Sequence, residues 1–414
     1  MKLLKLDQIF TKKIFRIPDY QRGYAWQIDQ LKDFWEDLVN LSKDRSHYSG
    51  VLTIRKILKQ DIKPESKEHW LMNSYEVYEV VDGQQRLTTF VIFIQAFIEL
   101  YKNIKENKDK NDDNIYISES IKLADVITSY LYKVKPTGNQ FRTYKFGYTE
   151  DNPSYEYMRH RIFGESGHGE VQETFYTSNL SFAKEFFDKQ LKKYYDNFKI
   201  DGLDEIFIKI TQSFLFNEYE IENEFDVFVA FETMNNRGKK LSYLELLKNR
   251  LIYLTSLFSD DDVGLDDRTQ LRKSINDAWQ EIYHQLGKNK SHRLPDDDFL
   301  KAHWIMYFKY SRKRGNDYIT FLLDTQFSPK RIYKKTYSDT EKYSEDLEIK
   351  AFEEDAGLET EEETSDEQDQ DIVHEKIDLS EINAYVFSLK ESAKHWFNTF
   401  NPDLASLDNL EKNH

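Results

Sequence analysis

Five consecutive residues, Asp82 to Arg86, combine a carboxylate, a glycine turn, two amides and a guanidinium. They follow a stretch rich in Val and Tyr, 75–81, and precede apolar residues at helical spacing, so the pattern predicts a strand, a tight turn and a helix. The start of a helix offers free backbone N–H groups and the positive end of the helix dipole, and Arg86 adds a fork of donors. This junction is therefore a candidate phosphate site.

The same residues have a purely structural interpretation. Asp82 as helix N-cap with Gln85 three residues later resembles a capping box, which needs no ligand. The string is also not a P-loop, because it lacks the G-x-x-x-x-G-K-[ST] pattern. Both interpretations stay open at this point.

A polar and aromatic loop is predicted upstream, within residues 14–27, where Pro18 and Gly23 break regular structure. Its side chains could stack on a base and bind phosphate oxygens, or they could belong to the core, as aromatic residues often do. The residues concerned are Tyr20, Gln21, Arg22, Tyr24 and Trp26.

Together the two segments resemble the N-terminal domain of the GmrSD family of type IV restriction enzymes. The resemblance rests on I-P-D-Y-Q-R-G-Y-A-W at 17–26 and V-V-D-G-Q-Q-R-L-T-T at 80–89. An N-x-R-G turn within 228–250 and a helical segment at 298–304 are further matches. The resemblance covers about residues 1–325, and D-G-Q-Q-R is its most specific part.

This resemblance implies a fold similar to the ParB and sulfiredoxin nucleotide-binding domains, with D-G-Q-Q-R supporting nucleoside triphosphate binding and hydrolysis. It assigns catalysis to Asp82, Gln84, Gln85 and Arg86. It assigns nucleotide binding to Tyr20, Gln21, Arg22, Tyr24, Gly83, Thr88, Asn236 and Arg237. Family members cut or exclude phage DNA that carries modified bases or a modified backbone, so modified DNA is the implied partner.

Charge suggests how these residues would act on a triphosphate. Arg22 and Arg86 can oppose the negative charges, and backbone N–H groups at the turn add oriented donors. Asp82 would repel phosphate unless it binds Mg²⁺, positions water or caps the helix, so Mg²⁺ is an implied cofactor. Gln84 or Gln85 could orient the attacking water, by analogy with GTPases of another fold.

The sequence provides no recognisable HNH nuclease pattern, which in the family belongs to a separate C-terminal domain. Such a site needs a general-base His and further ligands for a divalent metal. The H-R-L-P string at 292–295 precedes an acidic helix start and is interpreted as a loop. We therefore expect the nuclease to come from a missing C-terminal domain or a partner chain, and a homo-oligomer is a further expectation.

Composition favours a folded cytoplasmic protein. The 414 residues include no Cys, the N-terminus lacks the apolar core of a signal peptide, and the apolar run 90–100 is too short to span a membrane. The net charge of −16 is concentrated in 339–378, which holds 18 Asp or Glu and 3 Lys. We interpret that segment as a solvated linker rather than a DNA mimic or an autoinhibitory segment. The remaining chain is near neutral, so a DNA-facing surface is compatible with it.

The expected fold class is an α+β N-terminal domain followed by a mainly α-helical domain. The expected domains are 1–105 for nucleotide binding, 118–335 for the helices, 339–378 for the acidic linker and 379–414 for a short helical segment. Asp29 is predicted to cap a helix over 30–42, and Ser242 with Glu245 to form a capping box.

Three functions remain open: an NTPase module of a modification-dependent restriction system, a ParB-like switch that senses nucleotide or DNA without turnover, and a helical interaction scaffold. Hydrolysis separates the first two, and the scaffold predicts no nucleotide binding. The basic turn at Arg237, Lys239 and Lys240 could contact DNA, but antiparallel helices with such a turn are also common scaffold.

Overall fold

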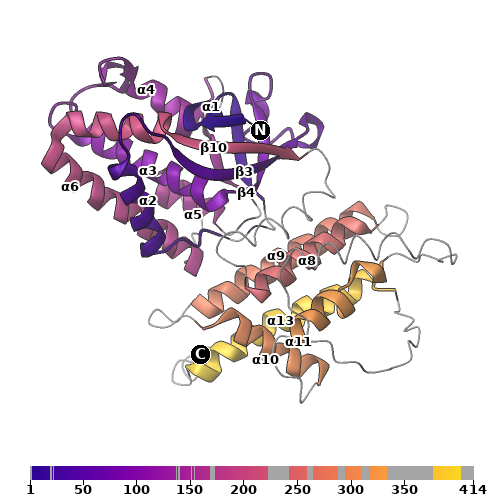
Figure 1. The fold of residues 1–414 in the computed structure, drawn as a ribbon. Helices are drawn as coiled ribbons and strands as arrows, with labels where there is room; N and C mark the ends of the chain where they lie inside the picture. Colours follow the sequence, from indigo (N-terminus) through magenta and orange to yellow (C-terminus); the bar gives the residue numbers. More distant parts are fainter. Residues whose placement is uncertain are drawn as a thin grey trace, which may run out of the picture.

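The computed structural model of this chain contains an α+β unit followed by a unit made of helices (Figure 1). It describes residues 2–18, 21, 23–136, 138, 140–150, 152, 154–167, 173–221, 242–258, 264–287, 294–309, 317–332 and 376–401. The expected fold class, α+β followed by mainly α-helical, is confirmed.

A six-stranded mixed sheet forms the centre of the α+β unit, in the order β1-β10-β3-β4-β2-β9. Its strands are β1 Lys2–Lys5, β2 Lys13–Ile17, β3 His47–Ile57, β4 Glu76–Asp82, β9 Phe146–Tyr148 and β10 Phe214–Ile221. Parallel pairs join β10 to β3 and β2 to both β4 and β9, whereas β1 with β10 and β3 with β4 are antiparallel. Two small sheets pair β5 Tyr116–Ile117 with β6 Ile121–Lys122 and β7 Tyr132–Val134 with β8 Arg142–Tyr144.

Helices flank this sheet and connect its strands. They are α1 Leu6–Phe10, α2 Ile28–Asn40, α3 Gln84–Asn103, α4 Leu123–Val126, α5 Tyr155–Tyr157 and α6 Phe175–Gln212. Short 3₁₀ turns lie at Lys59–Asp61, His69–Leu71 and Asp112–Asn114, and π-helical turns at Ile127–Leu131 and Met158–Ile162. Helix α6 changes direction at Lys199, whose φ of 58° and ψ of −155° are not helical.

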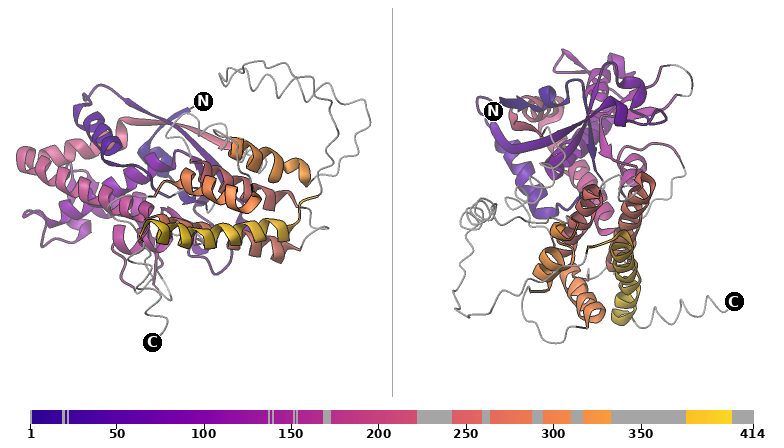
Figure 2. Two further views of the ribbon diagram at one scale, coloured as in Figure 1. Left: turned by 90° about the horizontal axis from the view of Figure 1, so that it is seen from below. Right: turned by 90° about the vertical axis from the view of Figure 1, so that its right-hand side faces the viewer.

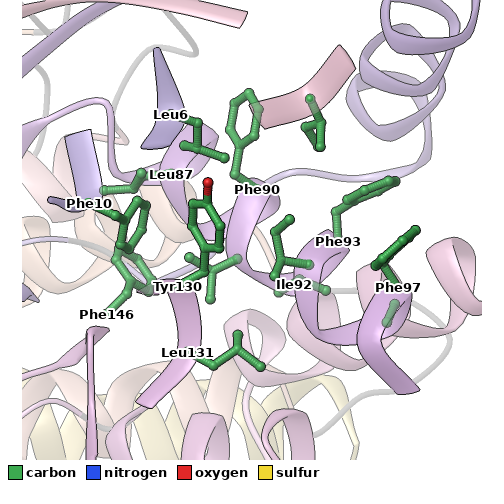
Figure 3. Close-up of a cluster of buried hydrophobic side chains, with 14 of the residues drawn as sticks. Leu6, Phe10, Leu87, Phe90, Ile92, Phe93, Phe97, Tyr130, Leu131 and Phe146 are labelled. Carbon is green, nitrogen blue, oxygen red and sulfur yellow. The ribbon is translucent and has the colours of Figure 1, made fainter. Parts of the chain in front are cut away.

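Helix α3 is the centre of the first hydrophobic core. Its residues from Leu87 to Ile98 are all buried, because α6 packs along it and the sheet and α2 enclose its other sides. Figure 3 shows Phe90, Phe93 and Phe97 of this helix among side chains from the surrounding elements. Phe34 of α2 meets the Phe90 ring edge to face at 5.1 Å, a favoured geometry for aromatic pairs.

The second unit is a bundle with its own core. Its helices are α8 Tyr243–Leu257, α9 Leu265–Gly287, α10 Asp296–Phe308, α11 Asp317–Thr320 and α13 Leu379–Phe400. A π-helical turn at Phe321–Gln326 and a 3₁₀ turn at Pro329–Arg331 complete it. Helices α9 and α13 pack side by side along much of their length (Figure 2). The predicted capping box is confirmed, since Ser242 Oγ accepts from the Glu245 N–H and Glu245 Oε2 accepts from the Ser242 N–H.

The domain boundaries expected from the sequence are wrong in two places. The α+β unit continues past residue 105 to Ile221, because β9 and β10 both join the sheet and α6 packs on α3. The helical unit begins at α8 rather than near residue 118, and α13 belongs to its core rather than to a separate C-terminal segment. Both errors arise because sheet pairing and helix docking between distant residues leave no local sequence signal.

Two further predictions concern helix starts and the acidic segment. Gln27, not Asp29, is the N-cap of α2, and the Gln30 side chain accepts from its backbone N–H at 2.9 Å. Residues 333–375, which include nearly all of the predicted acidic linker, lie outside the described residues. None of the helices in the described ranges combines the length and apolar character that crossing a bilayer requires.

One buried lysine gives the fold a pH dependence that can be measured. Lys145 is 1% exposed, donates to the carbonyl of Phe10 at 2.9 Å and lies 4.2 Å from the centre of the Tyr75 ring. Burial, together with the nearby charge of Lys133, lowers the pKa of this ammonium to about 7. The unfolded chain keeps the proton up to a pKa of about 10.4.

Between these two pKa values the unfolded chain binds more protons, so we expect stability to rise with pH, by at most about 1.4 kcal/mol per pH unit. Lys145→Met should flatten this rise, whereas Lys189→Met at an exposed position should not. Urea unfolding of the three proteins at pH 7, 8 and 9 measures the slope. An unchanged slope in Lys145→Met would contradict the assignment.

Candidate functional site

The backbone geometry of the β4–α3 junction depends on a single glycine. Gly83 has φ of 92° and ψ of 4°, a left-handed conformation that favours glycine, and it is the N-cap of α3. A Cβ at this position would lie 3.1 Å from the carbonyl oxygen of Val51 on β3. The first helical hydrogen bond runs from Leu87 N–H to the carbonyl of Gly83 at 3.0 Å. The N–H groups of Gln84, Gln85 and Arg86 therefore precede the helical ladder, as a helix N-terminus requires for anion binding.

The capping box predicted for Asp82 and Gln85 is wrong. Asp82 is the last residue of β4 and Gly83 takes the N-cap position, with no side-chain cap. Gln85 instead reaches sideways to the upstream loop. Spacing alone could not separate these arrangements, because a Gln three residues after an Asp fits both.

The Arg86 side chain extends from α3 to the backbone of strand β3. Its Nη1 donates to the carbonyl of Ser49 and its Nη2 to the carbonyl of Val51, the latter at 2.7 Å. Between these two carbonyls lies Gly50, with φ of 97°, and a Cβ there would be 1.6 Å from Arg86 Nη1. Gly50 is therefore the residue that lets the guanidinium reach the strand. The sequence contains a signal for this role of Gly50, since a glycine inside a strand often marks the close approach of another group to the backbone.

Asp82 and Arg86 form a loose ion pair, with 3.7 Å between Oδ2 and Nη2. Burial raises the pKa of the Asp82 carboxyl, although Arg86 and the Gly83 N–H oppose this shift. Burial likewise lowers the pKa of Arg86, against the attraction of Asp82. Both directions show that each charge has lost part of its hydration, so a charged ligand here would meet weakly solvated groups.

The two glutamines hold the upstream loop against the start of α3. Gln85 Oε1 accepts from the Ala25 N–H at 2.7 Å, and Gln85 Nε2 donates to the Gly23 carbonyl at 3.1 Å. Gln84 Nε2 donates to Gln21 Oε1 at 2.7 Å, and Gln21 Nε2 donates to the Val81 carbonyl at 2.6 Å. The side-chain amide oxygen of Gln84, Oε1, is buried and has no hydrogen-bond partner in the part of the chain that the structure describes.

Two predicted nucleotide-binding residues lie in the core behind this junction. Tyr24 is fully buried and its hydroxyl lies 2.7 Å from Thr89 Oγ1, and burial raises the pKa of the phenol. Thr88 is 1% exposed and its Oγ1 donates to the Gln84 carbonyl at 2.7 Å. In this structure both side chains pack in the core behind the junction, and neither lies on its surface.

A pocket of about 200 Å³ opens beside Arg86, between α2, β3 and α3. Its lining combines one guanidinium, two carboxylates, an imidazole and aromatic rings. The lining residues are Trp26, Gln30, Asp33, Phe34, Asp37, His47, Tyr48, Ser49, Arg86, Phe90 and Phe214. The Ser49 hydroxyl is buried here and has no hydrogen-bond partner among the described residues. Trp26 and Arg86 were identified from the sequence, whereas the contributions of α2 and β3 were missed because only folding brings them together.

Four predicted nucleotide-binding residues, Tyr20, Arg22, Asn236 and Arg237, lie outside the described residues. Across the described ranges, no group of three or more His, Asp or Glu side chains is arranged to hold a metal ion.

Comparison with protein-family models matches residues 6–252 to the family described as GmrSD restriction endonuclease, N-terminal domain. The match spans most of the α+β unit and continues into α8, and it covers more than half of the chain. No curated protein matches the sequence.

The close approach of Arg86 to Gly50 predicts the effect of a single methyl group. Gly50→Ala should displace the guanidinium and break its two bonds to β3, whereas Gly164→Ala, at φ of 64° with open space around it, adds only backbone strain. We expect Gly50→Ala to be less stable than Gly164→Ala by about 1.5–3 kcal/mol, the range for a hydrogen bond to a charged group. Urea unfolding measures both variants, and equal losses would show that Arg86 adjusts freely.

Proposed function

Because the chain belongs to the GmrSD restriction endonuclease family, we propose that its α+β unit binds and hydrolyses a nucleoside triphosphate. The reaction would control cleavage of modified DNA in a type IV restriction or anti-phage defence system. The observation that carries the proposal is the placement of Arg86, which lies in the first turn of α3 and on the wall of a pocket.

Several features of the pocket support nucleotide binding. The carbonyls of Ser49 and Val51 each take one N–H of Arg86, and a guanidinium has five, so further donors remain for phosphate. Trp26 and Tyr48 offer aromatic faces on which a base can stack. Ligand pockets usually measure about 300–1,000 Å³, so this smaller one would enclose one part of a nucleotide, its base or its phosphates.

Mg²⁺ is the proposed cofactor, with Asp82 as its protein ligand. Mg²⁺ is often held by one or two carboxylates together with substrate phosphates and waters, so a single Asp at the phosphate site is a compatible donor set. When bound, the ion would neutralise phosphate charge. Asp82 would then face the cation rather than repel the triphosphate.

Hydrolysis would proceed by attack of water on the γ-phosphorus. A new oxygen–phosphorus bond forms, the bond to the β–γ bridging oxygen breaks, and the water releases a proton to give a nucleoside diphosphate and phosphate. Arg86 and the first N–H groups of α3 would stabilise the charge that spreads over the phosphoryl oxygens. Catalytic roles for Gln84 and Gln85 remain predictions.

A second candidate is a nucleotide or DNA sensor without turnover. Both amide atoms of Gln85 are bonded to the backbone of the loop, and Gln84 is 6% exposed and bonded to Gln21. In this arrangement neither amide is placed to orient an attacking water. This observation favours a switch in which binding itself is the signal.

The proposed partners follow from the family. Modified DNA would be the target, and a nuclease domain or a separate nuclease chain would make the cut. Assembly of several copies of this chain is also proposed, and a symmetric homo-oligomer is the form that most soluble oligomers take.

Phosphate release from each of the four NTPs with Mg²⁺ tests the proposal directly. We expect turnover in the wild type and at least a tenfold loss in Arg86→Lys, because lysine cannot serve two carbonyls and a phosphate with one ammonium group. Arg55→Ala is the matched control, since Arg55 pairs with Glu79 in the same sheet and does not line the pocket. Circular dichroism confirms that each variant is folded.

The outcomes separate the three functions. Turnover that Arg86→Lys loses and Arg55→Ala keeps supports the NTPase. Binding of an NTP without turnover supports the sensor. Wild-type protein that binds none of the four nucleotides would favour a scaffold and contradict the proposal.

A further inference from the structure

The loop beside the candidate site also contacts the first turn of α6. A Cβ on Gly23 would lie 2.5 Å from the Cβ of Tyr176, so only glycine lets the loop backbone pass this side chain. Asn179, one turn further along α6, donates from Nδ2 to the Tyr24 carbonyl at 3.0 Å. The loop is therefore held on one side by α6 and on the other by Gln85 of α3.

Tyr176 continues from this loop into the helical unit. Its hydroxyl donates to Glu245 Oε1 at 2.5 Å, and its ring meets Tyr283 of α9 edge to face at 5.0 Å. Glu245 is 5% exposed, and its second carboxylate oxygen accepts from the Ser242 N–H at 2.9 Å. One side chain thus joins the loop to the capping box at the start of α8.

Apolar contacts follow the same route. Ala25 of the loop and Val81 of β4 are buried in the core of the helical unit, together with Tyr176 and Leu244. Val81 immediately precedes Asp82, and its carbonyl is held by Gln21. A ligand that shifts the β4–α3 junction would therefore disturb packing in both units.

We propose that Tyr176 is a positioning residue for the nucleotide site and couples nucleotide binding to the start of α8. This inference rests on the proposed function and adds a regulatory role for the helical unit. The pairing of Tyr176 with Glu245 holds the loop in the arrangement that completes the pocket wall at Trp26. Linkage is reciprocal, so bound nucleotide also stabilises the Tyr176–Glu245 bond and the capping box of α8.

The test uses β,γ-methylene analogues of the four NTPs, which bind without being hydrolysed, and the full chain. Tyr176→Phe removes only the hydroxyl, and Glu245→Gln keeps a neutral acceptor at the same place. Tyr157→Phe is the matched control, because it removes another largely buried hydroxyl, bonded at 2.6 Å to Ser181 of α6. Titration gives the Kd of each variant, and hydrogen exchange with and without analogue reports on α8.

Coupling predicts that Tyr176→Phe and Glu245→Gln each weaken binding about three- to tenfold, as expected for one hydrogen bond. The double variant should lose no more than the weaker-binding single variant, because Tyr176→Phe already removes the bond that Glu245→Gln weakens. In the wild type the analogue should slow exchange at Ser242 to Glu245, and Tyr176→Phe should abolish that protection. Tyr157→Phe should behave as wild type in both measurements.

Three results would overturn the inference. Unchanged affinity and unchanged α8 protection in Tyr176→Phe would show that the bond between Tyr176 and Glu245 is not coupled to the ligand. Binding of the analogue by the wild-type protein would then still support the proposed function. Equal losses in Tyr176→Phe and Tyr157→Phe would show a general effect on folding. Failure of wild-type protein to bind any analogue would overturn the proposed function and the coupling together.

Discussion

The contact between Arg86 and the backbone of β3 is the constraint around which the candidate site is built. A guanidinium that bonds two carbonyls of a neighbouring strand needs that strand to approach within van der Waals distance, and only glycine at position 50 permits it. The left-handed turn at Gly83 then sets where Arg86 emerges from the helix. The start of α3 at Gly83, the backbone of β3 at Gly50 and the pocket wall at Arg86 are therefore parts of one arrangement. A change in any one of them would alter the other two.

The residues proposed to bind nucleotide also hold the junction together, and this structural role accounts for part of the polar character of the motif. Gln84 and Gln85 hold a loop that would otherwise leave buried backbone groups unpaired, and such groups are costly to bury. Asp82 and Arg86 form an ion pair at 3.7 Å, and both side chains are partly buried. A ligand that carries both phosphate and a cation could satisfy each charge separately, so the resting pair is compatible with an exchange of partners on binding.

Local patterns in the sequence predicted much of the α+β core and part of the site. The strand predicted at 75–81 lies within one residue of Glu76–Asp82, and the helix predicted after the glycine turn is Gln84–Asn103, because periodicity and the turn act over a few residues. The burial of Thr88 could not be predicted, since it depends on what packs against this residue. A glycine in a strand indicates a close approach, but the sequence does not show that Arg86 is the group that approaches Gly50. Strand β10 was missed for the same reason: it pairs with residues of β3 that lie 166 or 167 positions earlier, such as His47 opposite Phe214 and Arg55 opposite Ile221.

The placement of β10 has a consequence for how the protein is made. This strand lies between β1 and β3, so the N-terminal strand has its hydrogen-bonded neighbour only after Ile221 has been synthesised. Until Ile221 has emerged from the ribosome, one side of β3 is an unpaired strand edge, and such an edge is prone to pair with other chains. The pocket beside Arg86, whose lining includes Phe214 of β10, is therefore complete only after this late strand has joined the sheet.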